Sequence, residues 1–570
     1  MSESVPIDHA PWPARALLLA ALGIVIGPVI HLLVESASAN LWSEAPLAMA
    51  GAAFLAVGGV ALALSLERLR WRWSAGFALG VGVVVALVGW WNGAPGEWGA
   101  GEGWQFFSSL LATAIALPLF QTARDEGGLR IGPSVALYHA WTNVILWFAA
   151  WGFALATFLL VLLLGALFDL IGLSILRTLF DAEWPVWMLV CGAFGGAVGL
   201  LRDRDSVVGV LQKVVRAILS VLAPVLAAGL LVFVVALLFT GLEPLWEKTK
   251  STTPIVLVCL LGAVVLINAV IGNSREEEGR AAPLRWSAMA LAAVMLPLAL
   301  VAAVSTAKRI DQYGFTPDRL WALVFVGVAI AFAGAYLAVL VRGRGAWGKM
   351  LRRANVRLAV GICLLALFLA LPIVSFGAIS TRDQVARLEQ GRITPDRFDW
   401  AALRFDFGPA GRRALERLAR SGSPAVRAKA SAAVKAQDRW ALKAPELTPA
   451  ERLRRDPPKL VVTPAGAKVP AGLAEAVAMT GRCTVETCRL ELGHPEQPIL
   501  ISVPCRNCEI EIDVFARHAI GWTRLKSFAP PPPVRTVDAA GALPTATVEI
   551  RAVEKRQVFV DGKPVGPVLN

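Results

Sequence analysis

Residues 254–273 read Pro-Ile-Val-Leu-Val-Cys-Leu-Leu-Gly-Ala-Val-Val-Leu-Ile-Asn-Ala-Val-Ile-Gly-Asn, without one charged side chain. A helix rises about 1.5 Å per residue, so about 20 apolar residues cross the roughly 30 Å hydrocarbon core of a bilayer. Ten further apolar blocks of suitable length run over 14–34, 46–66, 74–92, 104–121, 137–165, 184–201, 214–240, 284–304, 319–341 and 356–377. We therefore predict an α-helical polytopic membrane protein with about eleven transmembrane helices.

The chain changes character after about residue 377. Hydrophobic residues make up 56% of the whole chain and charged residues only 17%, against about 45–50% and about 25% in soluble proteins. Past the last apolar block, residues 409–441 have helical character, prolines follow, and an alternation of period two begins near Leu460. We predict three regions: a transmembrane helical domain over 1–377, a helical and linker region over 378–458, and a small β-rich soluble domain with four cysteines over 459–570.

The formal net charge of +13 comes from arginines placed mainly in short loops between apolar blocks, which argues against nucleic-acid binding. Alternate loops are rich in Lys and Arg: Arg68, Arg70, Arg72, Arg124, Arg130, Arg202, Arg204, Lys213, Arg275, Arg280, Arg285, Arg342, Arg344, Lys349, Arg352, Arg353 and Arg357. Such loops face the cytoplasm. We expect a multi-pass protein of the bacterial cytoplasmic (inner) membrane, with a cytoplasmic N-terminus and a periplasmic C-terminal domain.

The first apolar block raises the question of a signal peptide. Ala37-Ser38-Ala39 is similar to a signal-peptidase site. The apolar run from Leu17 to Val34 is longer than the usual core of a signal peptide, so an uncleaved anchor is favoured over cleavage.

Residues 499–514, Ile-Leu-Ile-Ser-Val-Pro-Cys-Arg-Asn-Cys-Glu-Ile-Glu-Ile-Asp-Val, alternate as a hairpin about Arg506-Asn507. The predicted pairs are Val503 with Ile510, Ile501 with Ile512 and Ile499 with Val514. These apolar residues share one face, and a slip of one residue would destroy that match. Residues 488–493 also alternate and predict a third strand, which gives a three-stranded meander.

Four cysteines converge at one end of this predicted sheet: Cys483, Cys488, Cys505 and Cys508. Two disulfides suit a small β-domain in an oxidising compartment. The spacing C-x4-C-x16-C-x2-C is also close to that of a zinc site, and a redox role for Cys505-Arg-Asn-Cys508 is a third reading. The periplasmic location favours disulfides, and zinc ligation by the same four thiols is the alternative.

Placing an ionisable side chain within a membrane span costs free energy, so such residues are candidates for function. Asp169 follows the fifth block and His139 lies near its start, although both are within reach of a membrane interface. The sequence contains no P-loop, no Gly-x-Ser-x-Gly elbow and no His-Glu-x-x-His. We therefore assign no catalytic residue and expect no cofactor, and we leave open whether the chain is an enzyme.

Residues 309–320, Arg-Ile-Asp-Gln-Tyr-Gly-Phe-Thr-Pro-Asp-Arg-Leu, resemble the Tyr-Gly-x-Thr-x-x-Arg signature of a bacterial membrane family catalogued as domain of unknown function 4153. Leu167-Phe-Asp-Leu-Ile-Gly172, Phe194-Gly195 and the segment from Leu388 to Leu418 are also similar to that family. The resemblance covers most of residues 100–420 and implies no activity.

The signature residues Tyr313, Gly314, Thr316 and Arg319 are candidate functional residues. Physically they predict a turn at Tyr313-Gly314 and then a helix capped by Thr316, with Pro317 at its first position. Arg319 adds positive charge to a loop expected outside, against the positive-inside rule. This charge suggests a site for an anionic lipid or glycan.

Three functions are compatible with the sequence, and the bilayer is the one partner that it establishes. The first is an envelope-associated or transporter-like membrane factor. The second is a membrane-anchored sensor or scaffold with a periplasmic binding domain. The third is an integral-membrane enzyme acting on lipid-linked substrates. A polar cavity near mid-membrane would favour a transporter, and a cluster of charged side chains at one membrane face would favour an enzyme.

Overall fold

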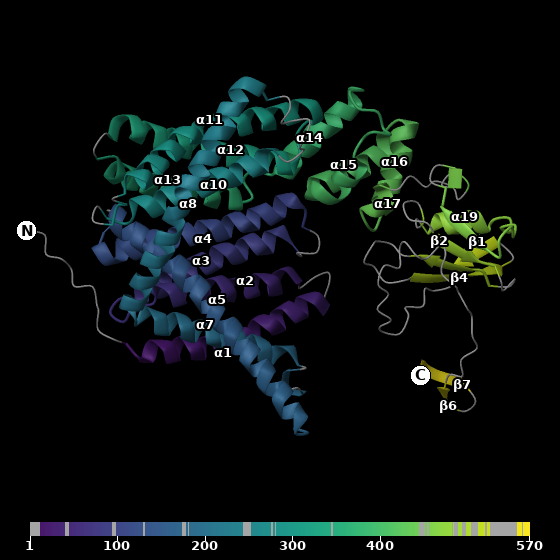
Figure 1. Ribbon diagram of the computed structural model, residues 1–570, viewed down its shortest axis with the longest axis horizontal. Coiled ribbons are helices and arrows are strands. Elements are labelled where there is room, and N and C mark those ends of the chain that lie inside the picture. The colour runs from purple at the N-terminus through teal and green to yellow at the C-terminus, as the bar shows by residue number, and fades with distance from the viewer. Residues whose placement is uncertain are drawn as a thin grey trace, which may run out of the picture. The chain divides into compact units, whose positions relative to one another are not determined.

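The computed structural model describes residues 12–39, 45–93, 98–128, 131–173, 178–180, 182–242, 252–274, 277–279, 281–343, 346–443, 450, 453–454, 457–480, 483, 488–492, 497–502, 511–518, 521–524, 556–560 and 563–569. The chain forms two compact units, residues 1–442 and 443–570 (Figure 1). The first unit contains the membrane spans and the helices that follow them. The predicted division at residues 377 and 458 remains a prediction.

Eleven helices in the described part of the chain are long and apolar enough to cross a membrane, which confirms the predicted polytopic fold. They are α1 (Ala14–Ala39), α2 (Ala45–Ser65), α3 (Trp71–Asn92), α4 (Ala100–Glu126), α5 (Pro133–Leu170), α7 (Glu183–Arg202), α8 (Asp205–Thr240), α10 (Thr252–Ile271), α11 (Ala282–Tyr313), α12 (Pro317–Gly343) and α13 (Trp347–Ala370).

The largest difference from the predicted spans is at α13, expected over 356–377. The helix begins at Trp347 and ends at Ala370, because its first turns contain arginines that the sequence suggested as loop. Arg352 is buried there and donates from Nη1 to the carbonyl oxygen of Ile271, at the last residue of α10, at 2.9 Å. Pro372 cannot continue a helix, which explains the early end.

The spans pack as two groups of helices (Figure 1). The first has a core of buried residues from α1, α2, α4, α5 and α7, with one residue from the start of α8. The second has its core in α8, α10, α11, α12 and α13. Helix α13 also packs against α4, so it connects the two groups.

The contact between α1 and α7 depends on glycine. A Cβ atom added at Gly23 would lie 2.9 Å from the nitrogen of Gly192, and one at Gly199 would lie 2.5 Å from the Cα of Ala16. One at Gly195 would collide with the backbone of Leu19. Small residues let the backbones of membrane helices approach closely, where dispersion and weak backbone contacts hold them.

After α13, four helices and a short π-helix form a small core of their own. They are α14 (Phe376–Glu389), η3 (Ala402–Asp406), α15 (Gly408–Ser421), α16 (Pro424–Lys435) and α17 (Trp440–Lys443). Arg439 and Asp406 form a bidentate pair with two contacts of 2.6 Å. The hydrogen bonds to this carboxylate raise the pKa of Arg439 above its ordinary value. We call residues 376–443 the outer helical segment.

The second unit contains a five-stranded sheet in sequence order, together with helix α19 (Leu473–Met479). The strands are β1 (Leu460–Thr463), β2 (Cys488–Glu491), β3 (Ile499–Ser502), β4 (Glu511–His518) and β5 (Gly521–Arg524). Strands β6 (Arg556–Val560) and β7 (Lys563–Leu569) form a separate pair. Strands β2, β3 and β4 are the predicted antiparallel meander.

The predicted hairpin register is confirmed, since Ile499 pairs with Val514 and Ile501 with Ile512. The pair Val503 and Ile510 lies outside the described residues. The opposite face of the sheet is also covered: Leu500 and Asp513 pair on it, and both are fully buried. Asp513 Oδ1 accepts a hydrogen bond from Arg524 Nε at 2.7 Å, and this pairing offsets the cost of burying the carboxylate.

Candidate functional site

The Tyr313–Arg319 segment joins α11 to α12 and has the predicted turn. Gly314 ends α11 with a φ of +74°, a conformation that glycine adopts at little cost. Helix α12 then begins at Pro317, and Thr316 Oγ1 accepts from the backbone nitrogen of Arg319 at 3.4 Å. The Thr316 side chain therefore caps the helix.

Helix α14 holds this turn from the side. Asp383 Oδ2 accepts from the Phe315 nitrogen at 2.8 Å. Gln384 Nε2 donates to the carbonyl oxygens of Tyr313 at 2.8 Å and Phe315 at 3.0 Å. Arg387 Nη2 donates to the Gln312 carbonyl oxygen at 3.0 Å. Backbone groups that a turn would leave unpaired are therefore satisfied by a helix some seventy residues later in the chain.

Arg319 is part of the same arrangement. Its Nη1 donates to the Gly314 carbonyl oxygen at 2.7 Å, and its guanidinium lies 5.3 Å from the centre of the Tyr313 ring. Arg309 approaches the same ring at 6.0 Å. Such cation–π contacts stabilise by about 0.5–1 kcal/mol at exposed sites. The signature residues thus form a structural junction between two spans and α14.

The other two candidates, His139 and Asp169, are not brought together. Both lie on α5, thirty positions apart, which corresponds to about 45 Å along the helix axis. His139 Nε2 lies 3.0 Å from Asp125 Oδ2, whereas Asp169 is exposed near the other end of α5. No single site contains both residues.

His139 belongs to a larger group of ionic side chains at the arginine-rich ends of the helices, which we call the charged cluster. Glu67 is its centre and contacts Arg15 at 3.3 Å, Arg124 at 3.9 Å, and Arg202. The cluster consists of Arg15, Glu67, Arg124, Asp125, His139, Arg202 and Asp203. The sequence interpretation uses Arg124 and Arg202 only for topology and does not identify the carboxylates that bring the cluster together.

Two hydrogen-bonded groups of neutral side chains lie inside the membrane domain. Asn268 Nδ2 donates to Tyr336 Oη at 2.8 Å, Tyr336 donates to Asn355 Oδ1 at 2.9 Å, and Asn355 Nδ2 donates to Asn268 Oδ1 at 2.6 Å. Gln121 and Asn143 exchange hydrogen bonds of 3.2 and 2.7 Å. Reciprocal pairing of this kind satisfies polar groups that lipid cannot.

A cavity of about 740 Å³ lies between α2, α4, α5 and α13. Its walls are almost wholly apolar, and the polar residues Thr113, Asn143, Arg352 and Asn355 contribute little to them. Its lining residues lie near the centres of these helices or toward their arginine-rich ends. Leu64 connects the cavity to the charged cluster: its side chain lines the cavity, and its carbonyl oxygen accepts from Gln121 Nε2 and Arg202 Nη1.

The model of the family described as Domain of unknown function (DUF4153) matches residues 18–418. The chain belongs to the DUF4153 family. No curated protein and no solved structure matches the chain.

The match to DUF4153 extends further toward the N-terminus than the predicted 100–420. It includes every spanning helix, from most of α1 onward, and continues through α14 and most of α15. The cavity, the charged cluster except for Arg15, and the Tyr313–Arg319 junction all lie in the matched region. The β-rich second unit lies beyond it.

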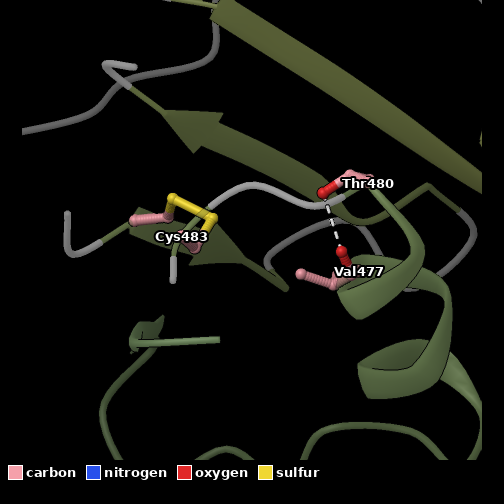
Figure 2. The surroundings of a disulfide bond; sticks show 4 residues. Val477, Thr480 and Cys483 are labelled. Carbon is pink, nitrogen blue, oxygen red and sulfur yellow. Dashed lines mark hydrogen bonds between the residues drawn. A yellow bond between two sulfur atoms is a disulfide. The ribbon is translucent and has the colours of Figure 1, made fainter. Parts of the chain in front are cut away.

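In the second unit, Cys483 and Cys488 form a disulfide with a Cα–Cα distance of 5.4 Å. Figure 2 shows it beside the end of α19, where Thr480 Oγ1 donates to the Val477 carbonyl oxygen at 2.7 Å. Both cysteines are buried in the core of this unit. Cys505 and Cys508 lie outside the described residues, and a disulfide between 483 and 488 removes two thiols that a zinc site would need.

Proposed function

We propose that this DUF4153 protein is an envelope-associated membrane factor that binds an amphiphile, with the hydrocarbon chain in the cavity between α2, α4, α5 and α13. The apolar cavity beside the charged cluster is the observation that supports this function. Its volume of about 740 Å³ falls in the range of about 300–1,000 Å³ common for small-molecule sites.

The chemistry of the walls favours a hydrocarbon occupant. Asn143 and Asn355, two of the polar residues at the wall, are already hydrogen-bonded within the protein. A polar solute would find few unsatisfied partners along these walls, which argues against transport of a hydrophilic substrate. A lipid chain has no desolvation cost on entry, because it exchanges one apolar environment for another.

The position of Arg352 favours an amphiphile with an acidic headgroup. Arg352 lines the cavity, and its guanidinium donates hydrogen bonds to the carbonyl oxygens of Ile271 at 2.9 Å and Ser274 at 3.5 Å. No carboxylate partner of Arg352 is found among the residues that the structure describes. An anionic group would supply the missing charge, and arginine is well suited to phosphate and carboxylate.

The charged cluster bears on whether the protein is an enzyme. It satisfies the expectation of an ionic cluster at one membrane face, yet each of its carboxylates already contacts an arginine. This pairing favours a structural role over acid–base catalysis. The proposal therefore assigns binding and handling of an amphiphile and no chemical step.

The proposal includes the expected location: the bacterial inner membrane, with the arginine-rich loops in the cytoplasm and the second unit in the periplasm. The uneven distribution of Lys and Arg among the loops supports it. The cavity would then open toward the cytoplasmic leaflet.

Native mass spectrometry of the purified protein tests the proposal. Wild type is expected to retain an amphiphile, and the double variant Ala140→Phe/Ala359→Phe to lose most of it, because both alanines line the cavity. Arg352→Gln should keep chain binding and lose the preference for acidic headgroups, since Gln can still donate to Ile271.

The matched control is Ala228→Phe, which places the same ring at an exposed position of α8 and should leave retention unchanged. Equal retention by wild type and the cavity variant, with both folded, would show that the amphiphile binds elsewhere.

A further inference from the structure

The first unit also contains a groove lined by charged side chains, in contrast to the apolar cavity. It has a volume of about 470 Å³ and runs between α14 and α15. Three arginines line it, Arg382, Arg413 and Arg417, with Glu389 as the one acidic residue of the lining. The buried residues of its lining are Val385 and Ala414, which are apolar, and Thr381. All three arginine side chains are exposed.

We propose that this groove binds the acidic headgroup of a phospholipid in the leaflet next to the outer helical segment. The site is separate from the cavity, which lies toward the arginine-rich loops at the other ends of the spans. Arginine forms paired, charge-assisted hydrogen bonds with phosphate, and the buried apolar residues of the lining suit the first carbons of a lipid.

The depth of the groove is fixed by α14. On one side of this helix, Asp383, Gln384 and Arg387 bond to the turn between two membrane spans. Residues 382, 385, 386 and 389 of the same helical turns line the groove. The groove therefore lies at the level of the turn between α11 and α12, the end at which these two spans reach the membrane surface.

Aromatic side chains mark the same level. The rings of Trp321 and Phe376 lie 5.0 Å apart, at the start of α12 and of α14. Trp104, at the start of α4, is half-buried and lies 5.9 Å from Trp321, which is itself buried. Tryptophan concentrates at the headgroup region of bilayers, and Trp104 is the partly exposed indole of this pair. This depth favours a lipid headgroup over a soluble polymer as the ligand.

Charge gives a further argument. Basic residues outside the membrane are not required for topology, which is set by short cytoplasmic loops. Within the described residues, Arg413 Nε has a weak contact of 3.3 Å to the Pro409 carbonyl oxygen. With three arginines and one glutamate in its lining, the groove has a net charge of +2. This charge is complementary to an anionic headgroup.

The test uses full-length protein in nanodiscs of phosphatidylcholine doped with phosphatidylglycerol. All variants carry Ala140→Phe/Ala359→Phe as well, so that lipid bound in the cavity does not contribute to the measurement. Enrichment of phosphatidylglycerol around the protein is measured by native mass spectrometry. Each basic residue near a membrane surface contributes about 1 kcal/mol, or about fivefold. The variant R382Q/R413Q/R417Q should therefore lose this enrichment, and R382K/R413K/R417K should keep most of it.

The matched control is R397Q/R420Q/R427Q, which removes three exposed arginines of the outer helical segment that do not line the groove. It should keep the enrichment. Unchanged enrichment in the groove variant, or equal loss in the control, would overturn the proposal. Full displacement of the lipid by inorganic phosphate would also overturn it, because the site would then be one for a free anion.

Discussion

Gly314 shows how a single residue can serve two requirements. Its φ of +74° is strained for any residue with a Cβ. A Cβ there would also lie 2.6 Å from Gln384 Nε2, in the group of side chains that hold the turn. The Tyr-Gly-x-Thr-x-x-Arg pattern is therefore explained by geometry before any ligand is considered.

We expect Gly314→Ala to destabilise the protein by about 1–3 kcal/mol, the usual cost of an unfavourable backbone conformation. The expected result is a lower midpoint of thermal unfolding in detergent. Gly327→Ala on α12 is the control, because nothing lies within 4 Å of its added Cβ and alanine favours a helix. Equal midpoints for wild type and Gly314→Ala would mean that the turn relaxes freely.

The turn at residues 313–317 could be predicted from sequence, because Gly, Thr and Pro each have a local conformational preference. Its partners on α14 could not be predicted, since Asp383, Gln384 and Arg387 carry no local signal for a turn seventy residues earlier. The same limit applies to the charged cluster, whose members come from five different parts of the chain. The charge pattern alone suggests an anion site at Arg319, because it does not show that the Gly314 carbonyl oxygen accepts a hydrogen bond from this side chain.

At the scale of elements, hydropathy located the helices well because a span is defined by its length and apolarity alone. The strand register was equally predictable, since alternation and a tight turn leave one solution. Burial of both faces of the sheet was not predictable: the cover over Leu500 depends on α19, whose residues Leu473 and Val477 join it in the core.

The α1–α7 pair gives a prediction for helix packing. Gly195→Leu should separate the two helices and destabilise the first group of spans, because an added Cβ would overlap the Leu19 backbone. Overpacking of this kind costs typically about 1–3 kcal/mol. Thermal unfolding of the purified protein should show a lowered midpoint.

Gly229→Leu on α8 is the matched control, since its added Cβ meets nothing within 4 Å. If both variants unfold at the wild-type temperature, the close approach of α1 and α7 contributes little to stability.

For the whole molecule, the two units differ in what stabilises them. The membrane unit pairs several of its buried polar side chains with one another, as in the triangle of Asn268, Tyr336 and Asn355. The second unit has a thin core and a disulfide within it. A short disulfide loop contributes typically about 2–4 kcal/mol, a large share of the stability of a small domain. The compartment of the second unit therefore matters for its folding.

The orientation of the chain in the membrane determines whether this disulfide can form. If the arginine-rich loops are cytoplasmic, alkaline-phosphatase fusions after residue 400 should be active and fusions within 342–357 inactive, because this enzyme folds only in an oxidising compartment. Mass spectrometry of the non-reduced protein should then find Cys483 joined to Cys488 and Cys505 joined to Cys508. A reversed fusion pattern would place the second unit in the cytoplasm. Free thiols with one bound zinc ion would independently place the second unit in the cytoplasm, because zinc ligation requires reduced cysteines.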